Sequence, residues 1–209
     1  MKVSDILSKK IIVAVRGANF EQSKNILSAL TDGGIEFIEF AFDQSGDYGA
    51  ALKAIEYAAS KGISVGSGTT LTQEQVNLAF NAGAKYIISP SMHLNVIKES
   101  KRLGLISIPG AFSPTEILEA HHAGADIVKL FPASTLGAGY IKAIRAPINH
   151  VPIMVMGGVD LGNMSEYFAA GAQAIGVGSN IVKKELITNG GWSEMARLAQ
   201  SYVRALEAL

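Results

Sequence analysis

"HAGADIVKLF", residues 122–131, contains in ten residues the unit from which most of the chain is built. Small or polar residues lead to Gly124, and an apolar run follows it. Glycine accepts the left-handed backbone that commonly ends a helix, and an apolar run after it is typical of a buried strand. The same pattern recurs at Gly34, Gly62, Gly83, Gly104 and Gly171.

Two further apolar runs complete the series, residues 11–15 and "VPIMVMGG" at 151–158. Eight strands result, each followed by a helical segment, the last at about 193–208, with a short leading helix at about 3–8. Glycine spacings of 20–21 residues through the middle of the chain leave room only for short loops. We therefore predict an α/β fold, a single (β/α)8 TIM barrel with a short N-terminal helix, as one domain over residues 1–209. A doubly wound open sheet is the alternative.

The composition narrows the class of protein. The chain has 209 residues, a formal net charge of +0 and no run of like charges, so we expect neither nucleic acid nor a membrane surface as a partner. It has no cysteine, which removes disulfides, thiolate metal sites and cysteine nucleophiles. We see no signal peptide and no apolar stretch near the ~20 residues of a membrane span, and we expect a cytoplasmic enzyme.

Strand alternation separates the side chains of three strands into an apolar face and a mixed face. The apolar faces should contact the outer helices, which leaves the mixed faces to line the barrel. These mixed faces consist of Ile127, Lys129 and Phe131, of Phe37, Glu39, Ala41 and Asp43, and of Ile12, Ala14 and Arg16. Active sites of this fold lie at the carboxyl ends of the strands. The residues Arg16, Glu39, Thr69 and Lys129 all lie at or near such ends.

A lysine among apolar neighbours has a specific chemical use. Burial disfavours the ammonium form and lowers the pKa of Lys129, so part of the amine is neutral near neutral pH. A neutral amine attacks a ketone to form a Schiff base, and Glu39 is the nearest group to move protons. This chemistry needs no metal and no cofactor. The alternative is a buried Lys–Glu pair without catalytic function.

The chain resembles a known family, the bacterial 2-keto-3-deoxy-6-phosphogluconate (KDPG) and 4-hydroxy-2-oxoglutarate (KHG) aldolases. These are class I enzymes of the Entner–Doudoroff type, and the family includes a 6-phosphogalactonate branch. The resemblance runs over about residues 11–209. It rests on "VRG" at 15–17, "GGIEFIEF" at 33–40, "GSGTTL" at 66–71, "SP" at 89–90, "IPGAFSPTE" at 108–116, "KLFPA" at 129–133, "GGV" at 157–159 and "GVGSN" at 176–180.

The resemblance implies a role for each matching residue. Lys129 would form the Schiff base and Glu39 would transfer protons. The pyruvyl pocket would be formed by Thr69, Phe131, Pro109 and Gly110. Backbone N–H groups and a hydroxyl would bind a phosphate at Gly157, Gly158, Gly178 and Ser179, although "GGV" also fits an ordinary tight turn. The resemblance further implies a homotrimer.

Two departures from the family pattern bear on the substrate. Asp43 stands where the gluconate branch typically has an arginine for the substrate carboxylate, and the galactonate branch tends to have a neutral polar residue there. A carboxylate would repel the substrate carboxylate, so Arg16 is the candidate clamp. In "GVGSN" the gluconate branch commonly has a tryptophan after the serine. Both departures concern the sugar acid and leave the Schiff-base chemistry intact.

The predicted function is cleavage of a 2-keto-3-deoxy-6-phospho sugar acid or of 4-hydroxy-2-oxoglutarate. The products would be pyruvate and an aldehyde, either glyceraldehyde 3-phosphate or glyoxylate. One alternative is another phosphate-binding barrel enzyme: an epimerase, an isomerase or a thiamine-phosphate-synthase-like protein. A second is a non-catalytic barrel that binds a sugar acid. Neither needs Lys129 and Glu39 together.

Overall fold

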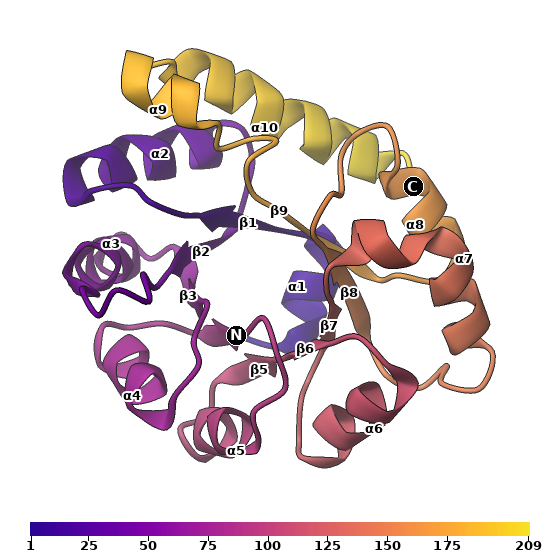
Figure 1. Ribbon diagram of the computed structural model, residues 1–209. Coiled ribbons are helices and arrows are strands. Elements are labelled where there is room, and N and C mark those ends of the chain that lie inside the picture. The colour runs from indigo at the N-terminus through magenta and orange to yellow at the C-terminus, as the bar shows by residue number, and fades with distance from the viewer.

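A ring of parallel strands forms the centre of the computed structural model, which describes residues 1–209 (Figure 1). The strands are β1 (Ile11–Val15), β2 (Phe37–Ala41), β3 (Ser64–Gly68), β4 (Tyr86–Ile88), β5 (Ile106–Ile108), β6 (Gly110–Ala111), β7 (Val128–Leu130), β8 (Ile153–Met156) and β9 (Ala174–Val177). Each is paired in parallel with its neighbours, in the order β5-β4-β3-β2-β1-β9-β8-β7-β6. The prediction of a TIM barrel is confirmed.

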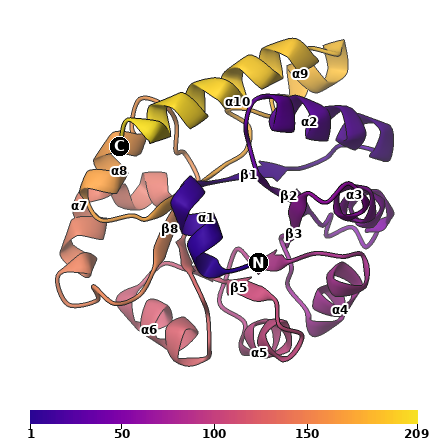
Figure 2. The ribbon, with the colours of Figure 1, turned by 180° about the vertical axis from the view of Figure 1, so that it is seen from behind.

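Helices surround the ring and cover its outer face (Figures 1 and 2). They are α2 (Phe20–Asp32), α3 (Gly49–Ser60), α4 (Gln73–Asn81), α5 (Leu94–Arg102), α6 (Pro114–His122), α7 (Ala133–Arg145), α8 (Met164–Ala169), α9 (Lys184–Asn189) and α10 (Trp192–Glu207). Local sequence fixes several of their starts, because Asn19, Thr72 and Ser113 each cap a helix with a glutamine or glutamate three residues later. The leading helix α1 (Val3–Lys9) lies across one end of the ring.

The fifth strand of the barrel is interrupted, so the structure has nine strand segments where the sequence predicts eight. Pro109 separates β5 from β6, because proline has no N–H to donate to a strand ladder. Backbone bonds nevertheless continue through the break: Lys129 N donates to Pro109 O at 2.8 Å, and Phe131 N donates to Ala111 O at 3.1 Å. The interrupted strand therefore still pairs with β7 and closes the ring.

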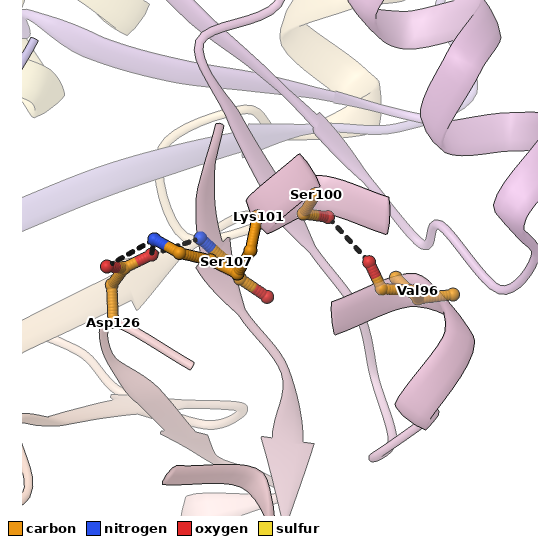
Figure 3. Close-up of polar contacts among 5 residues, drawn as sticks. All are labelled: Val96, Ser100, Lys101, Ser107 and Asp126. Atoms are coloured by element: carbon orange, nitrogen blue, oxygen red, sulfur yellow. Dashed lines mark hydrogen bonds and ion pairs between the residues drawn. The ribbon is translucent and has the colours of Figure 1, made fainter. Parts of the chain in front are cut away.

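A charged side chain fixes the start of this closing pair (Figure 3). Asp126, just before β7, accepts a bond from Ser107 N at 2.8 Å and binds Lys101 Nζ on α5 at 2.6 Å. Its own N–H donates to Ser107 O at 3.0 Å. On the same helix, Ser100 Oγ donates to Val96 O at 2.7 Å. Asp126 thus joins α5, β5 and the strand that carries Lys129.

The buried residues form two groups, as strand alternation predicts. The larger group lies between strands and outer helices and includes Val13, Ile38, Val128 and Ile175. The smaller group fills the inside of the ring with Ile12, Phe37, Tyr86, Ile88, Ile106, Ile108, Ile127, Met154 and Ala174. Ile6 of α1 belongs to the inner group, so α1 closes the amino-terminal end of the barrel. The carboxyl ends of the strands are left for the site.

The six-residue helix α9, between β9 and α10, is not indicated by the sequence pattern. It has few apolar residues, so the sequence shows no helical period there, and none of its residues is buried.

None of the helices is long and apolar enough to span a membrane.

Candidate active site

Lys129 lies at the centre of β7 with its side chain inside the ring. Its neighbours Val128 and Leu130 are fully buried on the opposite face, and Lys129 itself is 5% exposed. The Lys129 Nζ atom lies 4.7 Å from the centre of the Phe131 ring. Burial lowers the pKa of the Lys129 amine below its usual value; the nearby carboxyl of Glu39 opposes this shift and the guanidinium of Arg16 adds to it.

Glu39 enters the ring from β2 and is 3% exposed. Its Oε2 atom is buried and has no hydrogen-bond partner. Burial raises the pKa of the Glu39 carboxyl, while the cations Lys129 and Arg16 act in the opposite direction. None of the five ion pairs in the structure includes Glu39 or Lys129. The acid and the amine are therefore near enough to influence each other, and neither is consumed by a salt bridge.

Two glycines of β3 leave space for the side chains of Glu39 and Tyr86. A Cβ at Gly68 would overlap the Glu39 carboxylate, and a Cβ at Gly66 would overlap the ring of Tyr86. The Tyr86 hydroxyl in turn donates to Ile38 O at 2.7 Å. The glycines of "GSGTTL" are thus explained by close approach of side chains from the neighbouring strands.

Thr69, directly after β3, has a left-handed backbone with φ of 53°. Such a conformation costs a β-branched residue about 1–3 kcal/mol and persists only where surrounding contacts hold it. The Thr69 hydroxyl accepts a bond from Arg16 Nη2 at 3.0 Å. Arg16 follows β1, so this contact joins the ends of two different strands.

Beside this cluster lies a cavity of ≈ 770 Å³ at the ends of β1, β8 and β9. Six of the predicted site residues line it: Arg16, Phe131, Gly157, Gly158, Gly178 and Ser179. The charged residues of its wall are Arg16 and Lys184, both cations. This is the charge that an anionic ligand requires.

The glycine turn of this cavity is held by two asparagines. Gly157 and Gly158 both have positive φ, 92° and 76°. Asn163 Nδ2 donates to Gly158 O at 2.8 Å, and Asn180 Nδ2 donates to Val159 O at 2.8 Å. Asn180 comes from the "GVGSN" segment, so it joins the two turns that the sequence analysis assigned to phosphate.

Pro109 and Gly110 lie beside Lys129 through the backbone. Lys129 N donates to Pro109 O, and Gly110 is the register partner of Lys129 in the neighbouring strand. A Cβ at Gly110 would overlap Pro90 O, so this position admits only glycine without a backbone shift. Of the eleven predicted residues, six line the cavity, Thr69 is joined to them through Arg16, and Pro109 and Gly110 flank Lys129, which lies with Glu39 inside the ring.

Several cavity residues were missed by the sequence analysis: Gln22, Asn180, Lys184, Ile187 and Thr188. Asn180 is visible in "GVGSN", but nothing in the sequence indicates that residues of α9 line the cavity. Asp43 lines a separate pocket of ≈ 260 Å³, where its Oδ1 atom accepts a bond from Ser45 N at 2.9 Å. One oxygen of its carboxylate is therefore bonded within its own turn. The structure contains no group of three or more His, Cys, Asp or Glu placed to hold a metal ion.

A barrel whose interior presents a desolvated amine and a buried carboxyl group, next to a cationic cavity, has the parts of an enzyme that reacts covalently with carbonyl compounds. The sequence profile of the KDPG and KHG aldolases matches residues 3–198. The chain belongs to this family and is an aldolase, a carbon–carbon lyase. The resemblance seen in the sequence is confirmed.

Individual relatives agree with the family. The chain is 34% identical over 178 residues to the "Probable 2-dehydro-3-deoxy-6-phosphogalactonate aldolase" of Rhizobium meliloti (strain 1021), which covers 85% of this chain and 84% of that protein. A native KDPGal structure is 28% identical, with a TM-score of 0.86 over 95% of this chain and 94% of the other. KDPG aldolase from Legionella pneumophila, with pyruvate captured as a covalent carbinolamine, is 27% identical, with a TM-score of 0.88 over 96% and 98%.

Proposed function

We propose that the chain is a class I aldolase acting on a 2-keto-3-deoxy-6-phospho sugar acid, KDPG or its galactonate epimer, or on 4-hydroxy-2-oxoglutarate. The products are pyruvate and either glyceraldehyde 3-phosphate or glyoxylate. The observation that carries the proposal is the buried amine of Lys129, whose pKa is lowered by burial. Burial also raises the pKa of the nearby Glu39 carboxyl. The carbinolamine of the Legionella pneumophila enzyme supports covalent chemistry, and the Rhizobium meliloti relative favours the galactonate epimer.

The covalent step begins at the ketone. The neutral Nζ of Lys129 attacks C2 of the keto acid and forms a carbinolamine, which loses water to give an iminium ion. Glu39 supplies the proton that this departing water needs. The positive iminium nitrogen then serves as the electron sink for bond cleavage.

Carbon–carbon cleavage follows on the same adduct. The Glu39 carboxylate takes the proton of the C4 hydroxyl, the C3–C4 bond breaks, and its electron pair moves toward the iminium to leave an enamine. The aldehyde departs. The enamine carbon, formerly C3, takes a proton from the Glu39 carboxylic acid, and water hydrolyses the resulting iminium to pyruvate and the free amine. Hydrolysis of the iminium to the neutral amine releases one proton, which returns to the Glu39 carboxylate, so Glu39 ends as it began, as a carboxylic acid.

The other residues hold the two ends of the substrate. Because Asp43 stands at the position where the gluconate branch typically has an arginine, Arg16 pairs with the substrate carboxylate, and its contact with Thr69 supports this position. Phe131, Thr69, Pro109 and Gly110 shape the pocket around the three pyruvyl carbons. The phosphate lies against the turns at Gly157, Gly158, Gly178 and Ser179, in the wall that carries only cationic charge.

The proposed reaction is independent of metal. The iminium supplies the electrophile that a divalent cation would otherwise supply, so turnover should survive excess EDTA. Loss of activity in EDTA with recovery on adding zinc or magnesium would contradict this.

Three further properties stay predictions: a homotrimer, a cytoplasmic location and a single domain over residues 1–209. Analytical ultracentrifugation would test the homotrimer.

Borohydride trapping tests the role of Lys129. Reduction in the presence of pyruvate should attach the pyruvyl group to the unaltered chain at Lys129, as peptide mass spectrometry shows. Lys129→Arg keeps a cation but forms no iminium, so it should abolish labelling and nearly all turnover. Lys142→Arg, at an exposed position of α7, is the matched control and should label normally. Continued labelling of Lys129→Arg would mean that another lysine is the nucleophile.

Substitution of the serine beside the glycine turns tests the phosphate position. Ser179→Asp places a carboxylate where a dianion should bind, so KM for the phosphorylated keto acids should rise about tenfold or more. KM for 4-hydroxy-2-oxoglutarate, which has no phosphate, should change little. Ser193→Asp on the exposed start of α10 controls for added charge. Equal losses on both substrate types would mean that these turns only shape the barrel end.

A further inference from the structure

The segment after β3 is held by side chains from outside it. Thr69 needs support because its left-handed backbone is disfavoured for a β-branched residue. Its carbonyl oxygen accepts a bond from Gln44 Nε2 at 2.9 Å, and its hydroxyl accepts the bond from Arg16. Gln44 lies in the loop after β2, the loop that also contains Asp43. Thr69 is thus bonded on one side to Gln44 and on the other to Arg16.

A buried glutamine determines how Gln44 is oriented. Gln75, the third residue of α4, is 2% exposed, and its Oε1 atom accepts bonds from Leu71 N at 2.6 Å and Thr72 N at 3.2 Å. Its amide nitrogen is therefore directed away from these donors. That nitrogen donates to Gln44 Oε1 at 3.3 Å and to the Tyr48 hydroxyl at 2.9 Å.

This arrangement fixes the direction of every bond in the chain of contacts. Because Gln75 presents its nitrogen, Gln44 must present its oxygen to Gln75, and its own nitrogen then faces the Thr69 carbonyl. The backbone after Thr69 has independent support, since Ser89 Oγ donates to Thr70 O at 2.7 Å and Thr70 N donates to Ile88 O at 3.2 Å. The exposed side chain of Gln44 is therefore not needed to fold the segment as a whole.

We propose that Gln44, oriented by Gln75, is a positioning residue of this aldolase: it holds Thr69 in the conformation that directs the Arg16 guanidinium toward the substrate carboxylate. The inference rests on the proposed function, in which Arg16 pairs with that carboxylate. It also gives the loop after β2 a role. Asp43 has no positive charge with which to bind the substrate carboxylate. The neighbouring Gln44 acts on that substrate carboxylate indirectly, through Thr69 and Arg16.

The test measures how much pyruvate is needed for half-maximal borohydride trapping. Gln44→Met has a side chain of similar length without donor or acceptor, and it should raise this concentration about three- to tenfold, the usual effect of one hydrogen bond. The rate of trapping at saturating pyruvate should stay within about twofold, because Lys129 and Glu39 are untouched. Gln75→Glu keeps the acceptor for Leu71 and Thr72 but loses the donor to Gln44, so it should shift the half-saturating concentration in the same direction.

A double-mutant cycle separates positioning from general structural support. Thr69→Val keeps the branched shape but removes the hydroxyl that binds Arg16, so adding Gln44→Met to it should cause no further rise. Melting temperatures should match that of the exposed control Gln200→Met on α10. Unchanged half-saturation in Gln44→Met, or additive losses in the cycle, would overturn the inference while leaving the aldolase intact. An unaltered chain that traps no pyruvate would instead overturn the proposed function, and the inference with it.

Discussion

At the scale of single residues, the site consists of two ionisable groups whose pKa values are moved toward each other. Burial lowers the pKa of Lys129 and raises that of Glu39, so each charged form is disfavoured where it lies. Both residues were predictable because a period of two residues places them on the inner face of their strands. Asn180 and Lys184 were not, since loops and short helices have no such period to follow.

The linkage between ionisation and folding predicts how Glu39 affects stability. Its pKa is raised in the folded chain above the unfolded value of about 4.5, so stability falls as pH rises from there through the folded pKa. Glu39→Gln removes this loss. The variant should gain stability relative to the unaltered chain as pH rises above about 4.5, and the gain should vanish at lower pH.

Urea unfolding at several pH values measures this effect. Glu56→Gln on the exposed face of α3 is the matched control and should show no such growing gain. If Glu39→Gln instead became progressively less stable than the unaltered chain as pH rose above about 4.5, ionised Glu39 would favour folding.

The same Glu39→Gln protein should still trap pyruvate, while turnover falls by about 10²–10⁴-fold, the usual contribution of a positioned acid–base group.

At the scale of elements, β7 is placed by the residue that precedes it. Asp126 bonds to the backbone of β5 and to Lys101 of α5, and Lys129 follows three residues later (Figure 3). The strand itself was predictable from its apolar run. The break at Pro109 was not, because a proline in a short apolar run fits both a strand edge and an interruption.

Removal of the Asp126 carboxylate should therefore weaken the closure of the ring. Asp126→Ala leaves the N–H of the buried Ser107 without its side-chain acceptor, and the free energy of unfolding should fall by about 1–3 kcal/mol. Lys101→Met removes only the partly exposed ion pair and should cost at most about 1 kcal/mol. Chemical denaturation of both variants compares the two contributions. Equal losses would place the stabilisation in the ion pair and not in the bond to β5.

At the scale of the whole molecule, the barrel separates stability from chemistry. The helix α1 lies across one end of the ring (Figure 2), where its Ile6 packs on the inner apolar residues, while the cavity is lined by residues at and after the carboxyl ends of β1, β8 and β9. This division follows from the fold, in which all strands are parallel, and it was predictable once eight repeating units were recognised. The small helix α9 and its cavity residues escaped prediction, because they depend on how a loop folds back over that end.

Substitution in α1 tests this separation. Ile6 is fully buried against the inner residues, so Ile6→Ala should lower the free energy of unfolding by about 2–5 kcal/mol. The values of kcat and KM should stay unchanged at temperatures where the variant is folded. Leu209→Ala, at a position 50% exposed, should change stability by less than about 0.5 kcal/mol. A substantial change in kcat for Ile6→Ala would show that the two ends of the barrel are coupled.

The glycine at position 68 has a consequence for how this enzyme can change over generations. Gly68 provides the room in which the Glu39 carboxylate lies. A larger residue at 68 would displace the acid, and a shorter acid at 39 would leave the room unfilled. A substitution at either position alone should therefore disturb the Glu39 carboxylate, and we expect a tolerated change at one to require a matching change at the other. The position of the Glu39 carboxylate therefore depends on two residues, the glutamate that supplies it and the glycine that leaves room for it.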